Sequence, residues 1–283
     1  MGSELMLLKY EGLGNDFLVL LDEDGTRPVD AVTARAVCDR HRGWGADGLL
    51  RATRAAAGSG AELTFELRNA DGGEAEMSGN GLRCLVHAAL DEGLVDGLLG
   101  AGGNATVLTP AGSREVRVLE LAQGRMWAST EMGTPKVTGT AQLCNVGNGQ
   151  LFVDVGNPHL VVLGPDPAGL DLAELGPVLS SAAGLGPTGL NVEFVTLGPT
   201  AGEVTMRVWE RGVGETLACG TGSVAAAAAL NHWGRVGAKV TVHQPGGAAE
   251  VELRDDGVAV LTGPSRRIGR CSFVPEQLAG AAR

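Results

Sequence analysis

Short apolar runs, each bounded by glycine, proline, asparagine or aspartate, recur along the whole chain and determine its predicted secondary structure. Within the runs, β-branched and other apolar residues alternate with polar ones or follow one another for a few positions, which is typical of β-strands. The predicted strands are Phe17–Asp22, Leu63–Arg68, Glu115–Leu121, Leu151–Val155, His159–Leu163, Val192–Leu197, Val204–Trp209, Lys239–His243, Glu250–Leu253 and Val258–Leu261.

Stretches with helical spacing are fewer. We expect helices over Ala31–His41, with Asp30 as a possible N-cap, and over Leu82–Glu92. A third follows at Ser223–His232, where the many alanines indicate a closely packed or buried helix, and Asp171–Ser181 is a weaker helical pattern. The glycine-rich stretch Gly97–Asn104 is predicted to be a loop.

One motif occurs twice, with a chemical difference between its copies. Residues 78–81 read Ser-Gly-Asn-Gly and residues 219–222 read Cys-Gly-Thr-Gly, each after a matched glutamate and before an apolar run. Two further segments match in the same order: residues 14–20 resemble 156–162, and residues 68–74 lie opposite 209–215. All three matches are spaced by roughly 140 positions, which indicates an internal duplication.

The repeats predict two homologous halves, residues 1–130 and 131–270, with a junction near Ser129–Pro135. Each half has one principal helix among many short strands. The expected fold class is therefore α+β, with two pseudo-symmetric domains, rather than the alternating pattern of a Rossmann fold.

Composition narrows the class of protein. A formal charge of −11 argues against a nucleic-acid partner. No apolar run approaches the roughly 20 residues that span a bilayer, and the N-terminus has no secretory pattern, so no membrane partner is expected. Five widely spaced cysteines without a C-x-x-C pair make a disulfide framework or a metal site unexpected, and a reduced cytoplasmic protein is the natural interpretation.

The two Gly-x-Gly motifs are the main candidates for chemistry. At a loop-to-helix junction, unpaired backbone N–H groups and the helix dipole attract an anion, and glycines let it approach closely. The two junctions would therefore hold a carboxylate from two sides. The same field is expected to lower the pKa of the Cys219 thiol. Ordinary helix capping by Ser78 is the structural alternative, which we would prefer for a single copy but not for two matched copies.

Other polar residues point to the same region. Four asparagines lie beside glycine or proline or at strand ends, where turn chemistry alone would explain each one: Asn15, Asn69, Asn157 and Asn191. Glu210 and Arg211 come between a predicted strand and the second motif; a surface ion pair is the simple explanation, but their place favours ligand contact. His159, at a repeat-matched position, could orient or assist a base.

No lysine lies in a context suited to a Schiff base, and neither a G-x-G-x-x-G after a strand nor a P-loop is present. The site is therefore expected to work without a cofactor. Two acid/base groups on either side of a bound carboxylate suit removal of the α-proton from one face and its return to the other, which inverts the configuration.

Seven motifs together resemble the diaminopimelate epimerase family, cofactor-independent enzymes that interconvert LL- and meso-2,6-diaminopimelate in lysine and peptidoglycan precursor biosynthesis. The resemblance covers most of the chain: Lys9–Phe17, Arg42–Gly48, Asn69–Gly72, Gly79–Cys84, Gly156–His159, Asn191–Phe194 and Glu210–Gly222.

The resemblance implies that each domain is a mostly antiparallel sheet around a central helix, and that residues 271–283 return to the first domain. It implies Cys219 as one catalytic acid/base, with His159 and Glu210 near the catalytic pair. The reacting carboxylate would be held by Gly79, Asn80, Gly220 and Thr221. The amino groups and distal carboxylate would be held by Asn15, Asn69, Asn157, Asn191, Glu210 and Arg211. A homodimer is implied as well.

The chain departs from the family at Ser78, where the resemblance implies the first catalytic cysteine. A serine hydroxyl is essentially un-ionised near neutral pH, so carboxylate binding should survive while epimerisation should be impaired. Ser78 is either an engineered substitution or a natural one, and the retained surrounding motifs favour a recent change. The alternatives are a proline racemase-like or dehydratase-like enzyme that needs one base, and a non-catalytic amino-acid binding protein.

Overall fold

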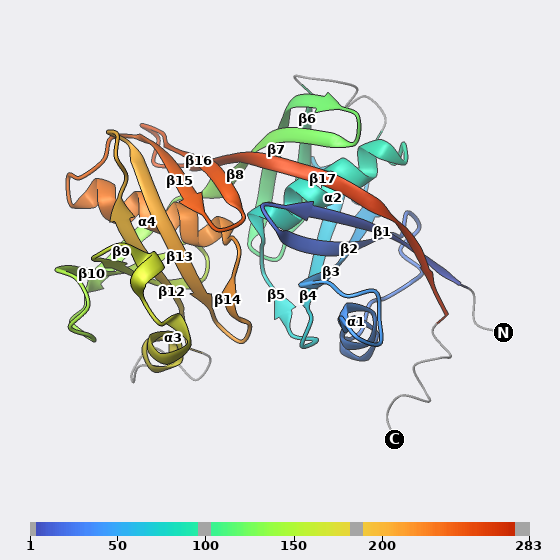
Figure 1. Ribbon diagram of the computed structural model, residues 1–283. Coiled ribbons are helices and arrows are strands. Elements are labelled where there is room, and N and C mark those ends of the chain that lie inside the picture. Colours follow the sequence, from blue (N-terminus) through green and yellow to red (C-terminus); the bar gives the residue numbers. More distant parts are fainter. Residues whose placement is uncertain (1–3, 96–102, 182–188, 275–283) are drawn as a thin grey trace. The chain divides into compact units, whose positions relative to one another are not determined.

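The computed structural model describes residues 4–95, 103–181 and 189–274, and these separate into two compact units (Figure 1). Unit 1 comprises residues 1–12, 16–130 and 264–283, and unit 2 comprises residues 13–15 and 131–263. The chain passes from unit 1 to unit 2 within one strand and returns within another, so each unit is built from more than one segment. Most of the loop expected over Gly97–Asn104 lies outside the described residues.

The strands of unit 1 pair mostly antiparallel. Two pairs are parallel, β2 with β3 and β4 with β6. The long last strand returns to this unit and lies antiparallel to β1, with Leu7 opposite Cys271. The strands are β1 (Leu5–Gly12), β2 (Asn15–Leu21), β3 (Gly48–Arg54), β4 (Leu63–Asn69), β5 (Glu74–Ala75), β6 (Asn104–Thr109), β7 (Gly112–Ala122), β8 (Arg125–Gly133) and the second part of β17 (Ala259–Phe273).

Unit 2 repeats this pattern. Its parallel pairs are β11 with β12 and β13 with β15, in the positions that β2–β3 and β4–β6 occupy in unit 1. The strands are β9 (Lys136–Thr140), β10 (Gly149–Asp154), β11 (Pro158–Leu163), β12 (Asn191–Leu197), β13 (Glu203–Glu210), β14 (Gly214–Thr216), β15 (Lys239–Gln244), β16 (Gly247–Leu253) and the first part of β17. The shared pairing pattern confirms the α+β class with two pseudo-symmetric halves.

Each unit has one central helix, α2 (Gly79–Asp91) in unit 1 and α4 (Gly220–His232) in unit 2, and each helix is 13 residues long. Nearly every residue of α2 from Gly79 to Ala89 is buried, because the strands of its unit pack around it (Figure 1). In α4 the buried face consists largely of alanines, whose small side chains let the surrounding strands approach the helix backbone. Both helices are thus enclosed on almost all sides, which holds their N-terminal ends in place.

Two shorter helices complete the units. Helix α1 (Ala31–Cys38) begins at Asp30, whose carboxylate accepts a hydrogen bond from the N–H of Thr33 at 2.7 Å, as expected for an N-cap. Helix α3 (Leu172–Ser180) is capped in the same way by Asp171, after a short 3₁₀ turn, η1 (Pro167–Gly169). Within the described residues no helix is long and apolar enough to cross a membrane.

All ten predicted strands overlap strands of the structure, but several strands and helix ends were missed. The strands that were not predicted are β1, β3, β5, β6, β8, β9 and β14. Both central helices begin at the glycine after Ser78 or Cys219, three residues earlier than expected. Glycine is a poor helix former, so the pattern predicts each helix to start only after its Gly-x-Gly motif. The cap hydrogen bonds outweigh that preference. Helix α1 ends at Cys38 rather than at His41.

Candidate functional site

The two repeated motifs form the same local structure, a helix N-cap. Ser78 has extended backbone angles (φ −144°, ψ 121°), and its Oγ accepts a hydrogen bond from the N–H of Gly81 at 3.0 Å. Cys219 has similar angles (φ −127°, ψ 120°), and its Sγ accepts one from the N–H of Gly222 at 3.3 Å. Each side chain therefore lies at the positive end of a central helix, with Gly79 and Asn80, or Gly220 and Thr221, in the first turn.

The predicted site residues fall into two groups. The N-terminal half-site, in unit 1, consists of Asn69, Ser78, Gly79 and Asn80. The C-terminal half-site, in unit 2, consists of Asn15, Asn157, His159, Asn191, Glu210, Arg211, Cys219, Gly220 and Thr221.

Cys219 is buried, with 5% of its surface exposed, and is held on its backbone side by polar groups. Its N–H donates to Oε1 of Gln244 at 2.8 Å, and its carbonyl accepts from the hydroxyl of Ser223 at 2.8 Å. The amide of Gln244 also donates to the Ser223 hydroxyl at 3.0 Å. This closed network fixes the backbone of Cys219, so that its thiol direction is set by the fold.

The expected lowering of the Cys219 pKa is wrong. Burial raises the pKa of this thiol well above its usual value, and the negative charges of Glu210 and Glu193 raise it further. Hydrogen bonds from Thr221 and the Gly222 N–H act in the opposite direction but do not offset burial. The helix end therefore opposes, but does not reverse, the rise in the Cys219 pKa that burial and the two carboxylates cause.

A chain of polar contacts leads away from the Cys219 sulfur. Sγ lies 3.5 Å from the hydroxyl oxygen of Thr221, which accepts a hydrogen bond from the Asn157 amide at 3.4 Å. The Oδ1 atom of Asn157 lies 2.9 Å from Nε2 of His159, and Nδ1 of His159 lies 2.7 Å from Oε1 of Glu193. The structure thus brings three predicted site residues to Cys219, together with a glutamate that was not predicted.

The remaining residues of the C-terminal half-site lie around the end of β13. Glu210 ends this strand, and its carboxylate accepts a hydrogen bond from the hydroxyl of Thr216. The side-chain oxygen of Asn191, at the start of β12, accepts from the backbone N–H of Arg211 at 2.9 Å. Asn191 therefore holds the turn that carries Arg211. Asn15 begins β2 but belongs to unit 2, because the preceding Gly14 packs closely against Leu217.

The N-terminal half-site has a different supporting structure. Asn69 lies at the end of β4, where its N–H donates to the Gly73 carbonyl at 2.8 Å. Asn80 is buried, and its Oδ1 accepts a hydrogen bond from the guanidinium of Arg83. Arg83 is fully buried, and burial lowers its pKa to about 10. The side chain of Asn80 is therefore oriented by a buried cation one turn along the helix.

Sequence reasoning missed Glu193, Gln244 and Arg83 as supporting residues. A charge inside the apolar run Asn191–Leu197 was the available signal for Glu193, since a charged residue is rarely fully buried without a partner. Arg83, within the apolar run Leu82–Val86, carried the same signal, whereas Gln244 had none. Among the described residues, no three histidine, cysteine, aspartate or glutamate side chains are grouped so that they could hold a metal ion.

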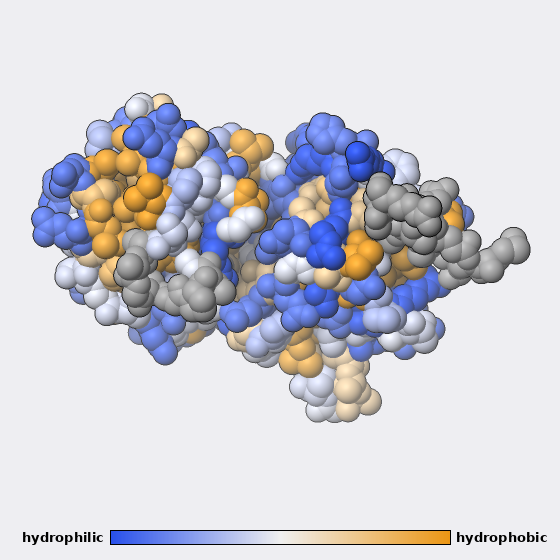
Figure 2. All heavy atoms as spheres, turned by 90° about the horizontal axis from the view of Figure 1, so that it is seen from below, coloured by the Kyte–Doolittle hydropathy of each residue, from blue (hydrophilic) through white to orange (hydrophobic). Residues whose placement is uncertain are grey.

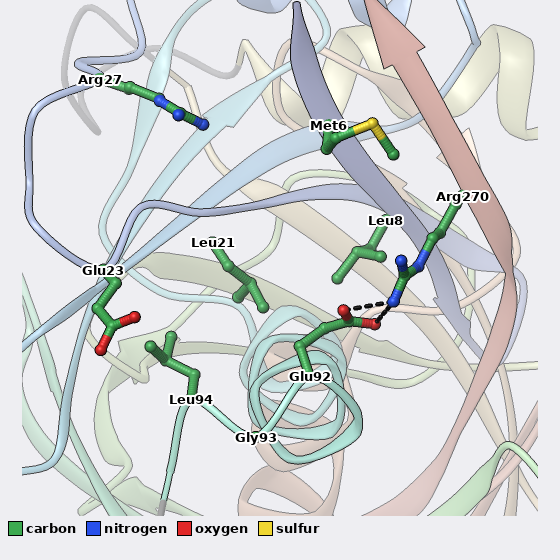
Figure 3. A pocket seen from close by; sticks show the side chains of 9 residues that line it. All are labelled: Met6, Leu8, Leu21, Glu23, Arg27, Glu92, Gly93, Leu94 and Arg270. Atoms are coloured by element: carbon green, nitrogen blue, oxygen red, sulfur yellow. Dashed lines mark hydrogen bonds and ion pairs between the residues drawn. The ribbon is translucent and has the colours of Figure 1, made fainter.

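A separate pocket of about 320 Å³ lies in unit 1, away from the predicted site residues (Figure 3). Leu8, Leu21 and Leu94 supply apolar surface, and Arg270 forms an ion pair with Glu92 at its side. On the face seen in Figure 2, hydrophobic residues form several separate patches among hydrophilic ones. Neither feature brings together the acid/base and anion-binding groups that the two helix N-termini carry.

Comparison with known proteins identifies the same family that the sequence motifs resemble. The family model described as diaminopimelate epimerase matches residues 7–138 and 151–268. A diaminopimelate epimerase of Corynebacterium glutamicum is 43% identical over 279 residues, covering 94% of this chain and 96% of that protein. One of Mycobacterium ulcerans is 39% identical over 280 residues, covering 92% of this chain and 94% of that protein.

Solved structures share the fold at lower identity. A hydroxyproline epimerase from Agrobacterium vitis matches with a TM-score of 0.72 and 18% identity, covering 95% of this chain and 91% of that one. A phenazine biosynthesis protein of the PhzF family from Bacillus anthracis matches with a TM-score of 0.68 and 13% identity, covering 96% and 99%. Because the family model and the close relatives extend over nearly the whole sequence, the chain belongs to the diaminopimelate epimerase family.

Proposed function

We propose that this chain is built to interconvert LL- and meso-2,6-diaminopimelate by moving a proton at the α-carbon, without a cofactor, in lysine and peptidoglycan precursor biosynthesis. The observation that carries the proposal is the Cys219 thiol at the N-cap of α4, next to anion-attracting backbone N–H groups and two carboxylates. We propose that the family's N-terminal half is residues 1–130 with 271–283 and its C-terminal half is residues 131–270. These halves correspond to units 1 and 2 apart from residues 13–15 and 264–270, which belong to the other unit.

The reacting carboxylate would bind at the N-terminal ends of α2 and α4. Gly79 and Asn80 at one end, and Gly220 and Thr221 at the other, supply backbone N–H groups where the helix dipoles are positive. A carboxylate held there would also acidify the adjacent α-proton, because charge that develops on the substrate is stabilised by the same groups.

Proton transfer requires one acid/base on each face of the α-carbon. Cys219 would serve one face: as thiolate it takes the α-proton, and as thiol it returns one. The other face falls to Ser78, whose hydroxyl already accepts the N–H of Gly81 as a helix cap. Because a serine hydroxyl neither ionises nor donates readily near neutral pH, we expect inversion to be slow in this chain.

The rest of the substrate would be held by polar side chains of both half-sites. Asn15, Asn69, Asn157, Asn191 and Glu210 offer oxygen atoms to the amino groups, and Arg211 offers a guanidinium to the distal carboxylate. We propose further that the protein is a cytoplasmic homodimer. The family resemblance and the five unpaired cysteines support this assignment.

One observation favours a second candidate function. The cap hydrogen bond at Ser78 gives this residue a structural role that needs no proton transfer. A protein with one working base could exchange the α-proton on a single face, or bind the amino acid without turnover. These outcomes differ from epimerisation in what happens to the α-hydrogen and to the configuration, so one experiment separates them.

The test follows LL- and meso-diaminopimelate in D2O by NMR and chiral chromatography, with the parent and three variants. Ser78→Cys should epimerise rapidly and place deuterium at the inverted centre. The parent should invert slowly, and its fastest reaction should be exchange at centres of one configuration only. Cys219→Ser should do neither, and Ser78→Cys with Cys219→Ser should exchange centres of the opposite configuration.

Two results would contradict the proposal. A Ser78→Cys variant that folds but neither inverts nor exchanges either isomer would show that the family's activity does not apply to this chain. Turnover by the parent as fast as by Ser78→Cys would show that serine can replace the thiol.

A further inference from the structure

A buried glutamate without an assigned role lies behind the C-terminal half-site. Glu193 is on β12 and is fully buried, as is its partner His159 on β11. Its Oε1 contacts Nδ1 of His159 at 2.7 Å, and its Oε2 has no hydrogen-bond partner among the described residues. Burial of an ionisable side chain is costly unless its contacts compensate for lost hydration, so this placement calls for an explanation.

The directions of the hydrogen bonds around Glu193 follow from the donors available. The Asn157 amide donates to the Thr221 hydroxyl through its nitrogen, which leaves Oδ1 of Asn157 as an acceptor. The ring nitrogen Nε2 of His159, 2.9 Å from Oδ1, must therefore be the donor. The other ring nitrogen, Nδ1, then shares a hydrogen bond with Oε1 of Glu193.

The chain of contacts ends at the reactive sulfur. Because the Thr221 oxygen receives the Asn157 N–H, its own hydrogen is free to point to Sγ of Cys219, 3.5 Å away. A hydroxyl that donates to sulfur favours the thiolate over the thiol. Reversal of the Asn157 amide would remove this arrangement, and an Nε2–H of His159, on the ring that Glu193 holds, opposes that reversal.

The duplication supplies an internal comparison. In the β2–β3 pair of unit 1, Phe17 lies opposite Gly48, just as His159 lies opposite Asn191 in the β11–β12 pair of unit 2. Two positions along each partner strand are Leu50 and Glu193. A Cβ added to Gly81 would meet Leu50, and one added to Gly222 would meet Glu193, so both residues lie behind the corresponding helix start. The polar pair His159 and Glu193 thus lies at the start of the helix that Cys219 caps. The apolar pair Phe17 and Leu50 has the corresponding place at the helix that Ser78 caps.

We propose that Glu193 is a positioning residue which, through His159 and Asn157, holds the Thr221 hydroxyl as a hydrogen-bond donor to the sulfur of Cys219. Glu193 does not touch the reacting atoms in this scheme. It fixes the donor and acceptor directions along the hydrogen bonds of Glu193, His159, Asn157 and Thr221. These hydrogen bonds favour the thiolate of Cys219.

The positioning role of Glu193 and a simple effect of its charge predict opposite changes in the reactivity of Cys219. As an isolated negative charge, Glu193 would disfavour the thiolate, so its removal would make Cys219 more reactive. As the anchor of the hydrogen-bond chain, it favours the thiolate, so its removal would make Cys219 less reactive. Glutamine distinguishes the two roles, since its amide donates to Nδ1 of His159 and preserves the chain while the charge is lost.

The experiment measures alkylation of Cys219 by iodoacetamide, as a function of pH, by mass spectrometry of the peptide that contains it. Glu193→Leu, which installs the residue found at the matching position in unit 1, should slow alkylation near neutral pH roughly tenfold, consistent with loss of a hydrogen bond to a charged sulfur. Glu193→Gln should stay within about twofold of the parent.

Further variants test the other residues of the hydrogen-bond chain, the specificity of the effect and the folding of the variants. Glu203→Gln removes a glutamate that faces His243 at 3.7 Å on the surface of unit 2, and should leave the Cys219 rate unchanged. Thr221→Val should slow alkylation as Glu193→Leu does, and the double variant should be no slower than either single one. If Glu193→Leu does not fold by circular dichroism, Glu193→Asp, which withdraws the carboxylate from the ring, should show the same slowing.

Faster alkylation in both Glu193→Leu and Glu193→Gln would overturn the proposal and leave the charge effect in its place. Additive effects of Glu193→Leu and Thr221→Val would also overturn it. The inference builds on the proposed acid/base role of Cys219, but alkylation needs no substrate. A failure of the epimerase assignment and a failure of the positioning role are therefore seen in different measurements.

Discussion

At the scale of single residues, two opposed effects act on the pKa of the Cys219 thiol. Burial and the carboxylates of Glu193 and Glu210 raise its pKa, whereas the hydrogen bonds from Thr221 and Gly222 lower it. The hydrogen bonds favour the thiolate that must take the α-proton, although they do not offset the rise in pKa that burial causes. Ser78 occupies the same kind of helix cap, but its hydroxyl does not ionise in the working range.

The charge of Glu210 is accessible to a direct test. Replacement of Glu210 by Gln removes a negative charge that raises the Cys219 pKa, so the pKa should fall and alkylation of Cys219 near neutral pH should become several-fold faster. Glu215→Gln, which removes a carboxylate paired with Arg207 on the neighbouring strand, is the matched control and should have little effect. Equal rates for the parent and Glu210→Gln, measured by the same peptide analysis, would argue against an electrostatic influence of Glu210.

At the scale of elements, the start of each central helix depends on its cap. The pattern of apolar residues located both helices but not their first turns, because glycine-rich starts carry no hydrophobic signal. The ten strands that were predicted have apolar runs between clear turn residues, whereas seven other strands were missed. Strand β3 was missed although Leu49, Leu50 and Ala52 are buried, because arginine and glycine interrupt its pattern.

Loss of the Ser78 cap should destabilise unit 1. Ser78→Ala removes the acceptor for the N–H of Gly81 and should cost about 1 kcal/mol in the free energy of unfolding. Urea unfolding followed by circular dichroism measures this change. Ser78→Thr, which retains a cap hydroxyl, should lie closer to the parent, and a Ser78→Ala variant as stable as the parent would show that the cap hydrogen bond contributes little.

A buried ion pair between Asp22, which directly follows β2, and Arg51 of β3 should make unit 1 sensitive to acid. Burial raises the pKa of Asp22, but hydrogen bonds from the N–H of Arg27 and the guanidinium of Arg51 outweigh this, so the pKa lies below its usual value. A carboxyl with a lowered pKa in the folded state stabilises the protein above its unfolded-state pKa of about 3.9. That contribution is lost as the pH falls through the lower, folded-state value.

Asp22→Asn should therefore lower the free energy of unfolding of unit 1 at neutral pH and reduce its further decrease below about pH 4. Urea unfolding at a series of pH values measures both effects. Arg51 keeps its ion pair with Glu66 in this variant, so the cation is not left without a partner. Parallel stability curves for the parent and Asp22→Asn over the whole pH range would contradict this assignment.

At the scale of the whole molecule, the chain crosses between its two units four times: on either side of residues 13–15, after Thr130 and after Gly263. Residues 131–263 complete unit 2, and the chain then returns to unit 1 from Pro264 onward, within β17. The returning part of β17 pairs with β1, and its Ser265 hydroxyl contacts the buried His87 of α2 at 2.8 Å. The last strand is therefore a structural part of the first unit.

Truncation after Gly263 should remove this contribution selectively. Strand β1 loses the partner that faces Leu5–Glu11, and α2 loses contacts of Arg83 and His87, so unit 1 should lose most of its protection in hydrogen exchange. Unit 2 should retain its protection, because its residues end at Gly263. Protection of β2 to β4 at the level of the full chain would show that the returning strand is dispensable.

The sequence by itself determined the duplication, the α+β class, the two central helices and the candidate residues of both half-sites. These features leave local patterns, because glycine, asparagine and apolar residues are required at fixed positions along each repeat. Only the tertiary structure decided the direction of the Cys219 pKa shift, the burial of Glu193 against His159 and the residue, Pro264, at which β17 enters unit 1. These depend on which side chains packing removes from water and which distant strands hydrogen bonding brings together, and a pattern read along the chain records neither.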